Sequence, residues 1–141
     1  MSIEQFCLIH PLRVRWSEAD MQGVVFNAHY LGYFDIGITE YWRALARDDA
    51  TWLAEAMERL FVVKATVEYH RPARFDDELK VAVRCSRLGR SSMTMDFEIH
   101  RLGDHLVSGQ SIYVYASEAK SMPIPEDLRS RINSFETVAP L

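Results

Sequence analysis

The chain has 141 residues, of which 48% are hydrophobic and 26% charged, so residues 1–141 have the size and composition of one globular domain. Its 16 lysine and arginine residues against 20 aspartate and glutamate residues give a formal charge of −4, which disfavours nucleic-acid binding. No apolar run approaches the roughly 20 residues of a membrane span. The first residues also lack the basic and apolar regions of a signal peptide. We therefore expect a cytoplasmic protein without membrane contact.

The cysteines and histidines give no sign of a metal site or another cofactor. Cys7 and Cys85 form no zinc-binding spacing and lie in apolar, strand-like stretches, which predicts free, buried thiols. The histidines share no ligand spacing with a cysteine or a carboxylate. These histidines are His10, His29, His70, His100 and His105. We expect no metal and no cofactor.

The first predicted element is a strand over residues 6–17. Residues of alternating polarity place Val14 and Trp16 on its apolar face. The following residues, 17–23, read as a loop, in which Gly23 supplies a positive φ without steric cost.

Helical periodicity replaces this alternation over residues 28–47. Apolar residues recur there over so wide an arc that we expect a long helix buried on most sides. Gly32 and Gly37 each weaken such a helix by roughly 1 kcal/mol, which indicates close approach of a sheet or a second chain. A second, shorter helix is predicted over residues 48–59.

The remainder of the chain is predicted to be mostly strand. Four alternating segments are separated by short, glycine-containing turns, and a helix follows Pro125. The strands are predicted at residues 63–70, 79–86, 93–100 and 105–117, and the last helix at 126–135. The simplest packing is an α+β fold in which an antiparallel sheet of about five strands wraps round the long central helix.

The most informative place for chemistry is the junction between the first strand and the long helix. Asp20 lies a few residues before the helix, whose first N–H groups are unpaired and carry partial positive charge. Such donors can hold a developing oxyanion while a carboxylate attacks or activates water beside it. The alternative is structural, with Asp20 as a turn residue and Asn27 as the helix cap.

Two segments resemble a known family. Residues 14–35 (VRWSEADMQGVVFNAHYLGYFD) contain an Asp, two variable residues, a Gly, a small apolar run and a Tyr that opens a helix. This pattern resembles the opening of the 4-hydroxybenzoyl-CoA thioesterase family of hotdog-fold proteins. Residues 68–79 (EYHRPARFDDEL) resemble its second landmark, a Tyr-x-x-Pro-Ala segment followed by Asp and a strand. The resemblance covers roughly residues 8–130.

The resemblance implies an acyl-CoA thioesterase in which Asp20 is the catalytic carboxylate, either as nucleophile or as general base. The backbone N–H of Asn27, together with that of Ala28, would polarise the thioester carbonyl. Related chains often carry His or Tyr at the place of Asn27 and Asn at the place of His29. This swap matters little if the contact is made by the backbone.

The resemblance also implies substrate contacts along the loop and at a distant turn. The predicted substrate-binding residues are Gly23, Val25, Asn27, Ala28, Tyr30, Arg87, Arg90 and Ser91. The two arginines and Ser91 would hold the phosphates of coenzyme A, because arginine suits phosphate. The alternative is a solvated turn. Tyr33 and Phe34 are further candidates for the acyl pocket, or simple core residues.

Members of this family pair their sheets edge to edge, with active sites at the subunit interface. The resemblance therefore implies at least a homodimer, with a tetramer expected, and an exposed edge strand supports this expectation. Two other functions stay open. One is a hotdog-type hydratase or dehydratase, for which His29 is the candidate catalytic histidine, and the other is a non-catalytic acyl-CoA-binding protein.

Overall fold

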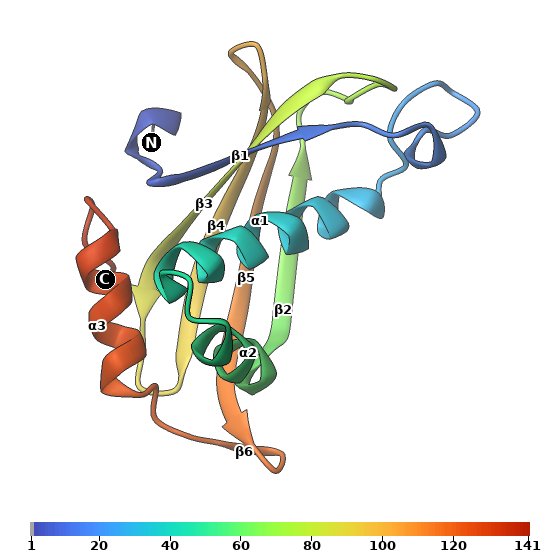
Figure 1. The fold of residues 1–141 in the computed structure, drawn as a ribbon. Helices are drawn as coiled ribbons and strands as arrows, with labels where there is room; N and C mark the ends of the chain where they lie inside the picture. Colours follow the sequence, from blue (N-terminus) through green and yellow to red (C-terminus); the bar gives the residue numbers. More distant parts are fainter. Residues whose placement is uncertain (1) are drawn as a thin grey trace.

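Apolar and polar residues alternate along the strands, so that one face of the sheet packs against a long helix. The sheet curls round that helix (Figure 1). The computed structural model describes residues 2–141. The strands are β1 (Leu8–Arg13), β2 (Leu60–Tyr69), β3 (Glu78–Leu88), β4 (Ser92–Arg101), β5 (Asp104–Ser117) and the short β6 (Lys120–Ser121). They form one antiparallel sheet in the order β1-β3-β4-β5-β2, with β6 paired to the end of β5.

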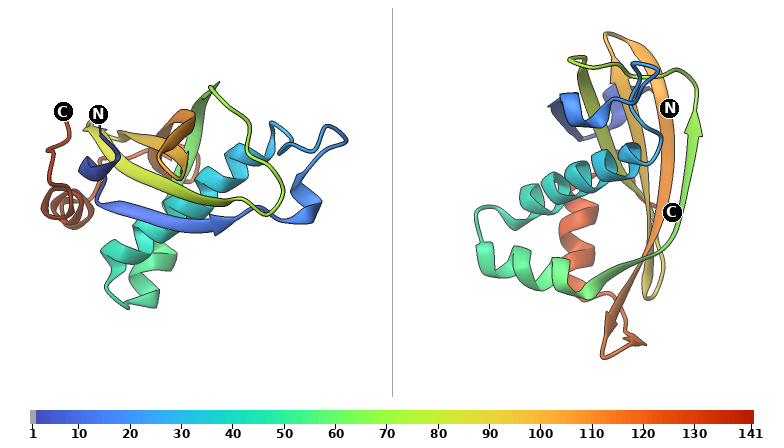
Figure 2. Two further views of the ribbon diagram at one scale, coloured as in Figure 1. Left: turned by 90° about the horizontal axis from the view of Figure 1, so that it is seen from above. Right: turned by 90° about the vertical axis from the view of Figure 1, so that its right-hand side faces the viewer.

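Three α-helices complete the fold of residues 2–141, together with two short 3-10 turns. They are α1 (His29–Ala46), α2 (Ala50–Arg59) and α3 (Glu126–Phe135), and the turns are η1 (Ile3–Gln5) and η2 (Trp16–Glu18). The side view in Figure 2 shows α1 and α2 on the same side of the sheet. Within the described part of the chain, no helix is both long and apolar enough to span a bilayer. The predicted α+β hotdog architecture is confirmed.

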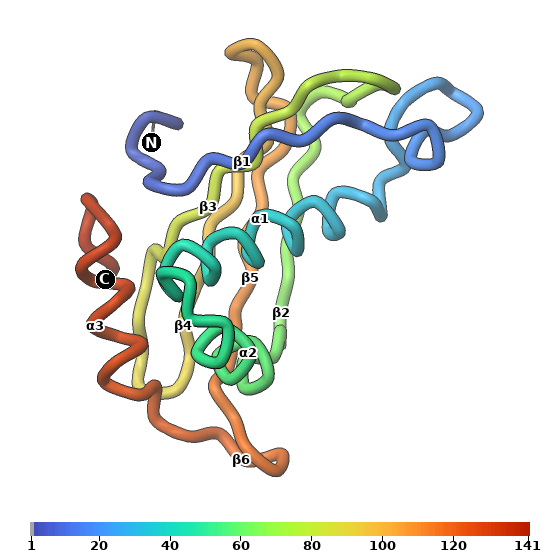
Figure 3. The backbone as a smooth tube through the Cα atoms, in the orientation of Figure 1, coloured from blue at the N-terminus to red at the C-terminus, as the bar shows by residue number. Residues whose placement is uncertain are grey.

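Strand β4 illustrates how the sheet separates its two faces. Met93, Met95, Phe97 and Ile99 are fully buried and face α1, while the residues between them are only partly buried on the opposite, outer face. The smooth trace in Figure 3 shows α1 crossing this strand and its neighbours near their middle. The core is therefore a single apolar layer between α1 and the inner face of the sheet.

The helix approaches the sheet so closely that side chains are excluded at two contacts. A Cβ atom on Gly37 of α1 would lie 2.7 Å from Val81 Cγ1 and 2.8 Å from Val83 Cγ2. A Cβ atom on Gly109 of β5 would overlap the ring of Phe34. The predicted close approach is thus correct for Gly37, whereas Gly32 faces open space within the described chain.

The first strand is shorter than the predicted range of 6–17. β1 ends at Arg13, although the N–H of Val14 still donates to the carbonyl of Asp77 in the register of the β1–β3 pair, and the 3-10 turn η2 then redirects the chain from Trp16 onward. Trp16 lies in that turn and is 76% exposed, so its predicted place on the apolar face is wrong. Its ring packs edge-on against Phe75 instead, at 5.0 Å between centroids.

The cysteines are both free thiols, as predicted, but only one is buried. Cys85 is completely buried in β3, whereas Cys7 is partly exposed. Cys7 precedes β1, and its sulfur lies 3.5 Å from the hydroxyl of Thr137 near the end of the chain. The prediction that Cys7 is buried is therefore wrong.

The two glycines of α1 provide a matched test of the helix–sheet contact. We expect Gly37→Ala to destabilise the fold, because overpacking costs about 1–3 kcal/mol while the gain in helix propensity is about 1 kcal/mol. Gly32→Ala meets no neighbour within 4 Å and should stabilise by about 1 kcal/mol. Urea unfolding of the two variants measures both effects. Equal changes in the free energy of unfolding for the two variants would contradict a close contact at Gly37.

Candidate active site

A small hairpin between η2 and α1 holds Asp20. The N–H of Asp20 donates to the carbonyl of Val24 at 2.8 Å, and the N–H of Gly23 donates to the carbonyl of Asp20 at 3.0 Å. Gly23 has a φ of +79°, as predicted, which suits a tight loop closed by a left-handed residue. The hairpin is fastened to the body by an antiparallel bridge between Val24 and Arg74.

Asp20 is partly exposed, and the turn occupies only one of its two carboxylate oxygens. Its Oδ1 atom accepts the N–H of Gln22 at 2.8 Å. Within residues 2–141 its other oxygen accepts no hydrogen bond. Asp20 is therefore a turn residue, as the structural alternative predicted. One of its carboxylate oxygens nevertheless has no hydrogen-bond partner among the described residues.

The start of α1 leaves backbone donors available. The helix begins at His29, and its capping residue is Ala28, which offers no side-chain acceptor. The interpretation of Asn27 as the helix cap is therefore wrong. Among the described residues, the N–H groups of Asn27 and Ala28 have no acceptor, and both residues are exposed. These donors lie where the helix dipole concentrates partial positive charge.

A hollow of about 220 Å³ lies at this helix start. Its lining includes three predicted residues, Val25, Asn27 and Tyr30. The other wall is the segment from Tyr69 to Pro72, which joins the end of β2 to the next loop. The hydroxyl of Tyr69 donates to the carbonyl of Asn27 at 3.1 Å and so connects the two walls.

Sequence reasoning did not assign this second wall to the site. The signal was present in the Tyr-x-x-Pro-Ala segment, which was used only to support the family resemblance. The structure explains the segment in part, because the N–H of Ala73 donates to the hydroxyl of Tyr30 at 3.0 Å and the carbonyl of Ala73 accepts the N–H of Val25 at 2.8 Å. Ala73 thereby positions the loop and the helix together.

A buried carboxylate ties the hairpin to α1. Glu18 accepts the hydroxyl of Tyr33 at 2.9 Å and receives the guanidinium of Arg15 at 2.7 and 3.1 Å. Burial alone would raise the pKa of Glu18, but the hydrogen bonds from Arg15 and Tyr33 hold that pKa below its ordinary value. Burial and the Glu18 carboxylate raise the pKa of Tyr33, which keeps its hydroxyl a donor.

The remaining predicted residues lie elsewhere in the chain. Arg87, Arg90 and Ser91 surround the turn between β3 and β4, whereas the Asp20 hairpin is fastened near the start of β3. The strand between these places has 11 residues, and such a strand spans about 33 Å. One chain therefore does not bring the two groups together. Tyr33 and Phe34 are buried core residues and do not line the hollow.

His29, the candidate histidine for hydratase chemistry, opens α1 but has no carboxylate partner among residues 2–141. Its ring lies edge-on to Phe26, at 6.1 Å between centroids. Nothing in this geometry pairs it with an acid.

The sequence model of the Thioesterase superfamily matches residues 22–108, which is more than half of the chain. The chain belongs to the Thioesterase superfamily. An acyl-CoA thioester hydrolase of Escherichia coli, YbgC, is 29% identical over 113 residues, covering 79% of this chain and 83% of that protein. Its counterpart in Haemophilus influenzae is 34% identical over 92 residues, covering 64% of this chain and 67% of that protein.

A solved structure extends the similarity to almost the whole chain. The structure of a thioesterase from Thermus thermophilus, complexed with coenzyme A and Zn, has a TM-score of 0.86 and 32% sequence identity. The match covers 98% of this chain and 99% of that one. These similarities confirm the predicted family, the hotdog fold and the prediction that this superfamily member is an enzyme.

The Glu18 network predicts a pH-dependent contribution to stability. We expect Glu18→Gln to destabilise the protein at neutral pH by about 1.5–3 kcal/mol, the value of hydrogen bonds to a charged group. Because the folded pKa of Glu18 is lowered, this contribution is complete above the ordinary value of 4.5 and is lost as the pH falls through the lowered pKa. Urea unfolding at several pH values measures the difference between variant and unmodified protein.

The control is Glu40→Gln, which removes a partly exposed i,i+3 pair with Arg43 and should change stability by less than about 1 kcal/mol. A Glu18→Gln effect that stays constant from neutral to strongly acidic pH would contradict the role assigned to the ionised carboxylate.

Proposed function

We propose that the chain hydrolyses acyl-CoA thioesters to a free acid and coenzyme A, with Asp20 as the catalytic carboxylate. The observation that carries the proposal is the pair of unpaired N–H groups on Asn27 and Ala28 at the start of α1, beside a hollow that the Asp20 hairpin adjoins. The Escherichia coli and Haemophilus influenzae relatives are named for this activity, and the Thermus thermophilus structure contains coenzyme A. The superfamily match begins at residue 22, so the role of Asp20 rests on its geometry and on the family resemblance.

In the proposed mechanism the thioester carbonyl oxygen accepts hydrogen bonds from the N–H groups of Asn27 and Ala28. These donors are strengthened by the helix dipole and stabilise the negative charge that develops on the oxygen. The contact needs no side chain, so Asn27 can stand where related chains carry other residues.

Asp20 then acts in one of two ways. As a nucleophile, its free carboxylate oxygen attacks the carbonyl carbon, the carbon–sulfur bond breaks, and the departing thiolate takes a proton. Water next hydrolyses the mixed anhydride and regenerates Asp20. As a general base, Asp20 takes a proton from a water molecule that attacks the carbonyl directly.

The other loop residues shape the site. Gly23 allows the tight turn that presents Asp20, because its φ of +79° is costly for residues with a side chain. Val25 and Tyr30 are both buried and supply apolar and aromatic walls for the acyl group.

Replacing Asp20 tests the chemistry. We expect Asp20→Asn to lower thiol release from a panel of acyl-CoA substrates by at least about a hundredfold, the usual scale of acid–base catalysis. Asp48→Asn, in the exposed loop between α1 and α2, is the control and should retain full activity.

Other outcomes identify the alternatives. Turnover that survives Asp20→Asn would show that another group does the chemistry. A folded protein that binds acyl-CoA but releases no thiol would be a binding protein, and hydration of an enoyl thioester without thiol release would indicate a hydratase.

A second copy of the chain would complete the site. Strand β2 lies at the edge of the sheet, and its Phe61, Val62 and Val63 are 54%, 51% and 61% exposed. An open edge strand with apolar side chains favours pairing with another chain. We propose a homodimer joined along β2, with further association to a tetramer. Arg87, Arg90 and Ser91 of the partner subunit would then contact the coenzyme A phosphates.

The two sheet edges allow a matched test of this interface. Val63→Lys on β2 should convert the dimer to monomers and reduce activity, because pairing would bury an unpaired charge. Ile9→Lys on β1, the opposite edge, should leave the dimer intact. Light scattering coupled to size-exclusion chromatography measures the mass. Dissociation by Ile9→Lys alone would place the interface at β1.

A further inference from the structure

The outer face of the sheet carries a cluster of ligand-type side chains that includes none of the proposed catalytic or substrate-binding residues. Glu98 and His100 project from β4, and His105 projects from β5 beside them. One ligand atom from each of the three side chains lies within 4.8 Å of the others. Neither the proposed thioester chemistry nor the core requires this grouping.

A β-bulge creates the cluster. Ile99 pairs with Val107, whereas the next residue, His100, pairs with His105, so Leu106 is an extra residue in β5. Leu106 and Val107 are both completely buried in the core. In a regular strand His105 would share the inward face of Val107, but the bulge turns it outward, opposite His100.

The three side chains are already close to the separations that a metal ion imposes. Nε2 of His100 lies 2.8 Å from Glu98 Oε1, and Nε2 of His105 lies 3.8 Å from the same oxygen. Zinc–ligand bonds of about 2.0–2.2 Å in tetrahedral geometry place ligand atoms about 3.3 Å apart. The two imidazole rings stack in parallel with their centroids 4.7 Å apart, so at least one ring would have to rotate for both nitrogens to point at one ion.

The ligand groups are partly buried. His100 is 8% exposed, and the side chain of Glu98 is 16% exposed. Nε2 of His105 lies 2.9 Å from the hydroxyl of Ser108 and 3.1 Å from the carbonyl oxygen of Val107, and an ion bound to this nitrogen would replace both contacts. Ligands that are partly buried lose less freedom when they bind an ion.

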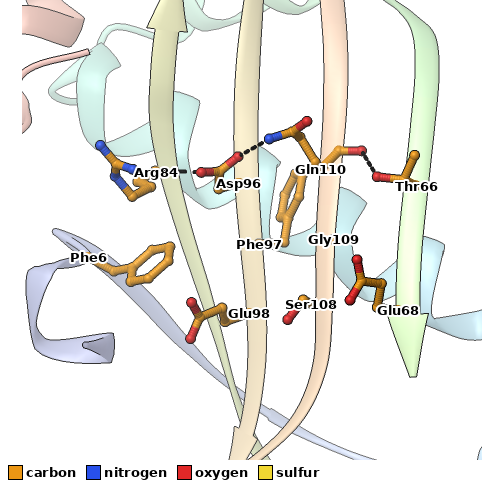
Figure 4. Close-up of a pocket in the computed structure, with 10 residues that line it drawn as sticks. All are labelled: Phe6, Thr66, Glu68, Arg84, Asp96, Phe97, Glu98, Ser108, Gly109 and Gln110. Atoms are coloured by element: carbon orange, nitrogen blue, oxygen red, sulfur yellow. Dashed lines mark hydrogen bonds and ion pairs between the residues drawn. The ribbon is translucent and has the colours of Figure 1, made fainter. Parts of the chain in front are cut away.

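The local charge favours a cation. A hollow of about 290 Å³ on this face is lined by the carboxylates of Glu68, Asp96 and Glu98 and, among the described residues, by a single cation, Arg84 (Figure 4). Arg84 lies 3.6 Å from Asp96, which leaves the other two carboxylates without a cationic partner among the residues that line the hollow. Lys80 of β3 pairs with His100 of β4 and is exposed, so its flexible ammonium group can extend into solvent.

We propose that Glu98, His100 and His105 form a binding site for a divalent transition-metal ion of the zinc class. Two imidazole nitrogens and one carboxylate oxygen match the ligand preference of such ions, whereas magnesium and calcium prefer oxygen alone. Three protein ligands leave a fourth position for water. The ion would join the two strands of the β4–β5 hairpin on the side opposite α1.

The test uses the full chain without a histidine tag, after removal of metal by a chelator. Calorimetric titration with Zn²⁺ should show one equivalent bound per chain and a raised melting temperature, because the ion binds only the folded state. Co²⁺ should give the visible absorption typical of four-coordinate sites, and Mg²⁺ should not bind. The metal proposal shares no residue with the proposed hydrolysis, so a failure to bind Zn²⁺ would not contradict that hydrolysis.

Variants locate the ligands. His105→Asn and Glu98→Gln should each weaken Zn²⁺ binding by more than the 10- to 100-fold typical of losing an outer partner of a metal site. His10→Asn on β1, outside the cluster, is the control and should bind as the unmodified protein does.

The proposal is overturned if the unmodified chain binds no Zn²⁺ and shows no Co²⁺ absorption, a result that needs no variant to fold. It is also overturned if His105→Asn and Glu98→Gln, folded by circular dichroism, retain the affinity of the unmodified protein. Equal loss in His10→Asn would show that the ion binds elsewhere.

Discussion

The contact between α1 and the inner face of the sheet is the constraint on which the rest of the structure depends. Gly37 lets the helix backbone meet Val81 and Val83 of β3, and Gly109 admits the ring of Phe34 against β5. With these contacts set, the sheet has to curve round the helix to keep its other apolar residues in contact with it. The position of the helix also decides where its first N–H groups lie, and these are the donors on which the proposed chemistry depends.

The loop before α1 is held to the same frame. Glu18 accepts the hydroxyl of Tyr33 of α1. The backbone N–H of Ala73 donates to the hydroxyl of Tyr30, and its carbonyl accepts the N–H of Val25. A site made of loop residues is thereby attached to the rigid part of the molecule at several points, which is what precise positioning of a reacting group requires. The start of α1 differs, because the N–H groups of Asn27 and Ala28 have no acceptor among the described residues. Such local exceptions are expected where a protein binds or transforms a ligand.

Regular elements were predictable from the sequence because periodicity reports which face is buried. The long helix and the strands were recognised in this way, whereas the positive φ of Gly23 was predicted because glycine adopts it without steric cost. Trp16 was misplaced because the alternation of apolar and polar residues continues through Trp16 in the sequence, whereas the chain turns into η2 at this residue. The alternation of polarity does not reveal that turn.

The candidate site was only half visible in the sequence for a similar reason. Asp20, Asn27 and Tyr30 are neighbours along the chain, so their motif could be read, whereas the wall from Tyr69 to Pro72 arrives through tertiary packing. The grouping of Glu98, His100 and His105 depends on a one-residue bulge, which reverses the face expected from simple alternation. Spacing arguments assume regular strands and therefore could not find it.

The strand order has a consequence for how the protein is made on the ribosome. Strand β5 lies between β4 and β2 and is the last of the five main strands in the sequence. Among the described residues, β2 has β5 as its sole partner, so it leaves the ribosome well before the strand that pairs with it. Until residues 104–117 follow, the apolar face of α1 lacks a complete sheet and both edges of β2 are open. The nascent chain therefore passes through a stage that exposes apolar surface, in which early contacts with chaperones or with another nascent copy compete with correct folding.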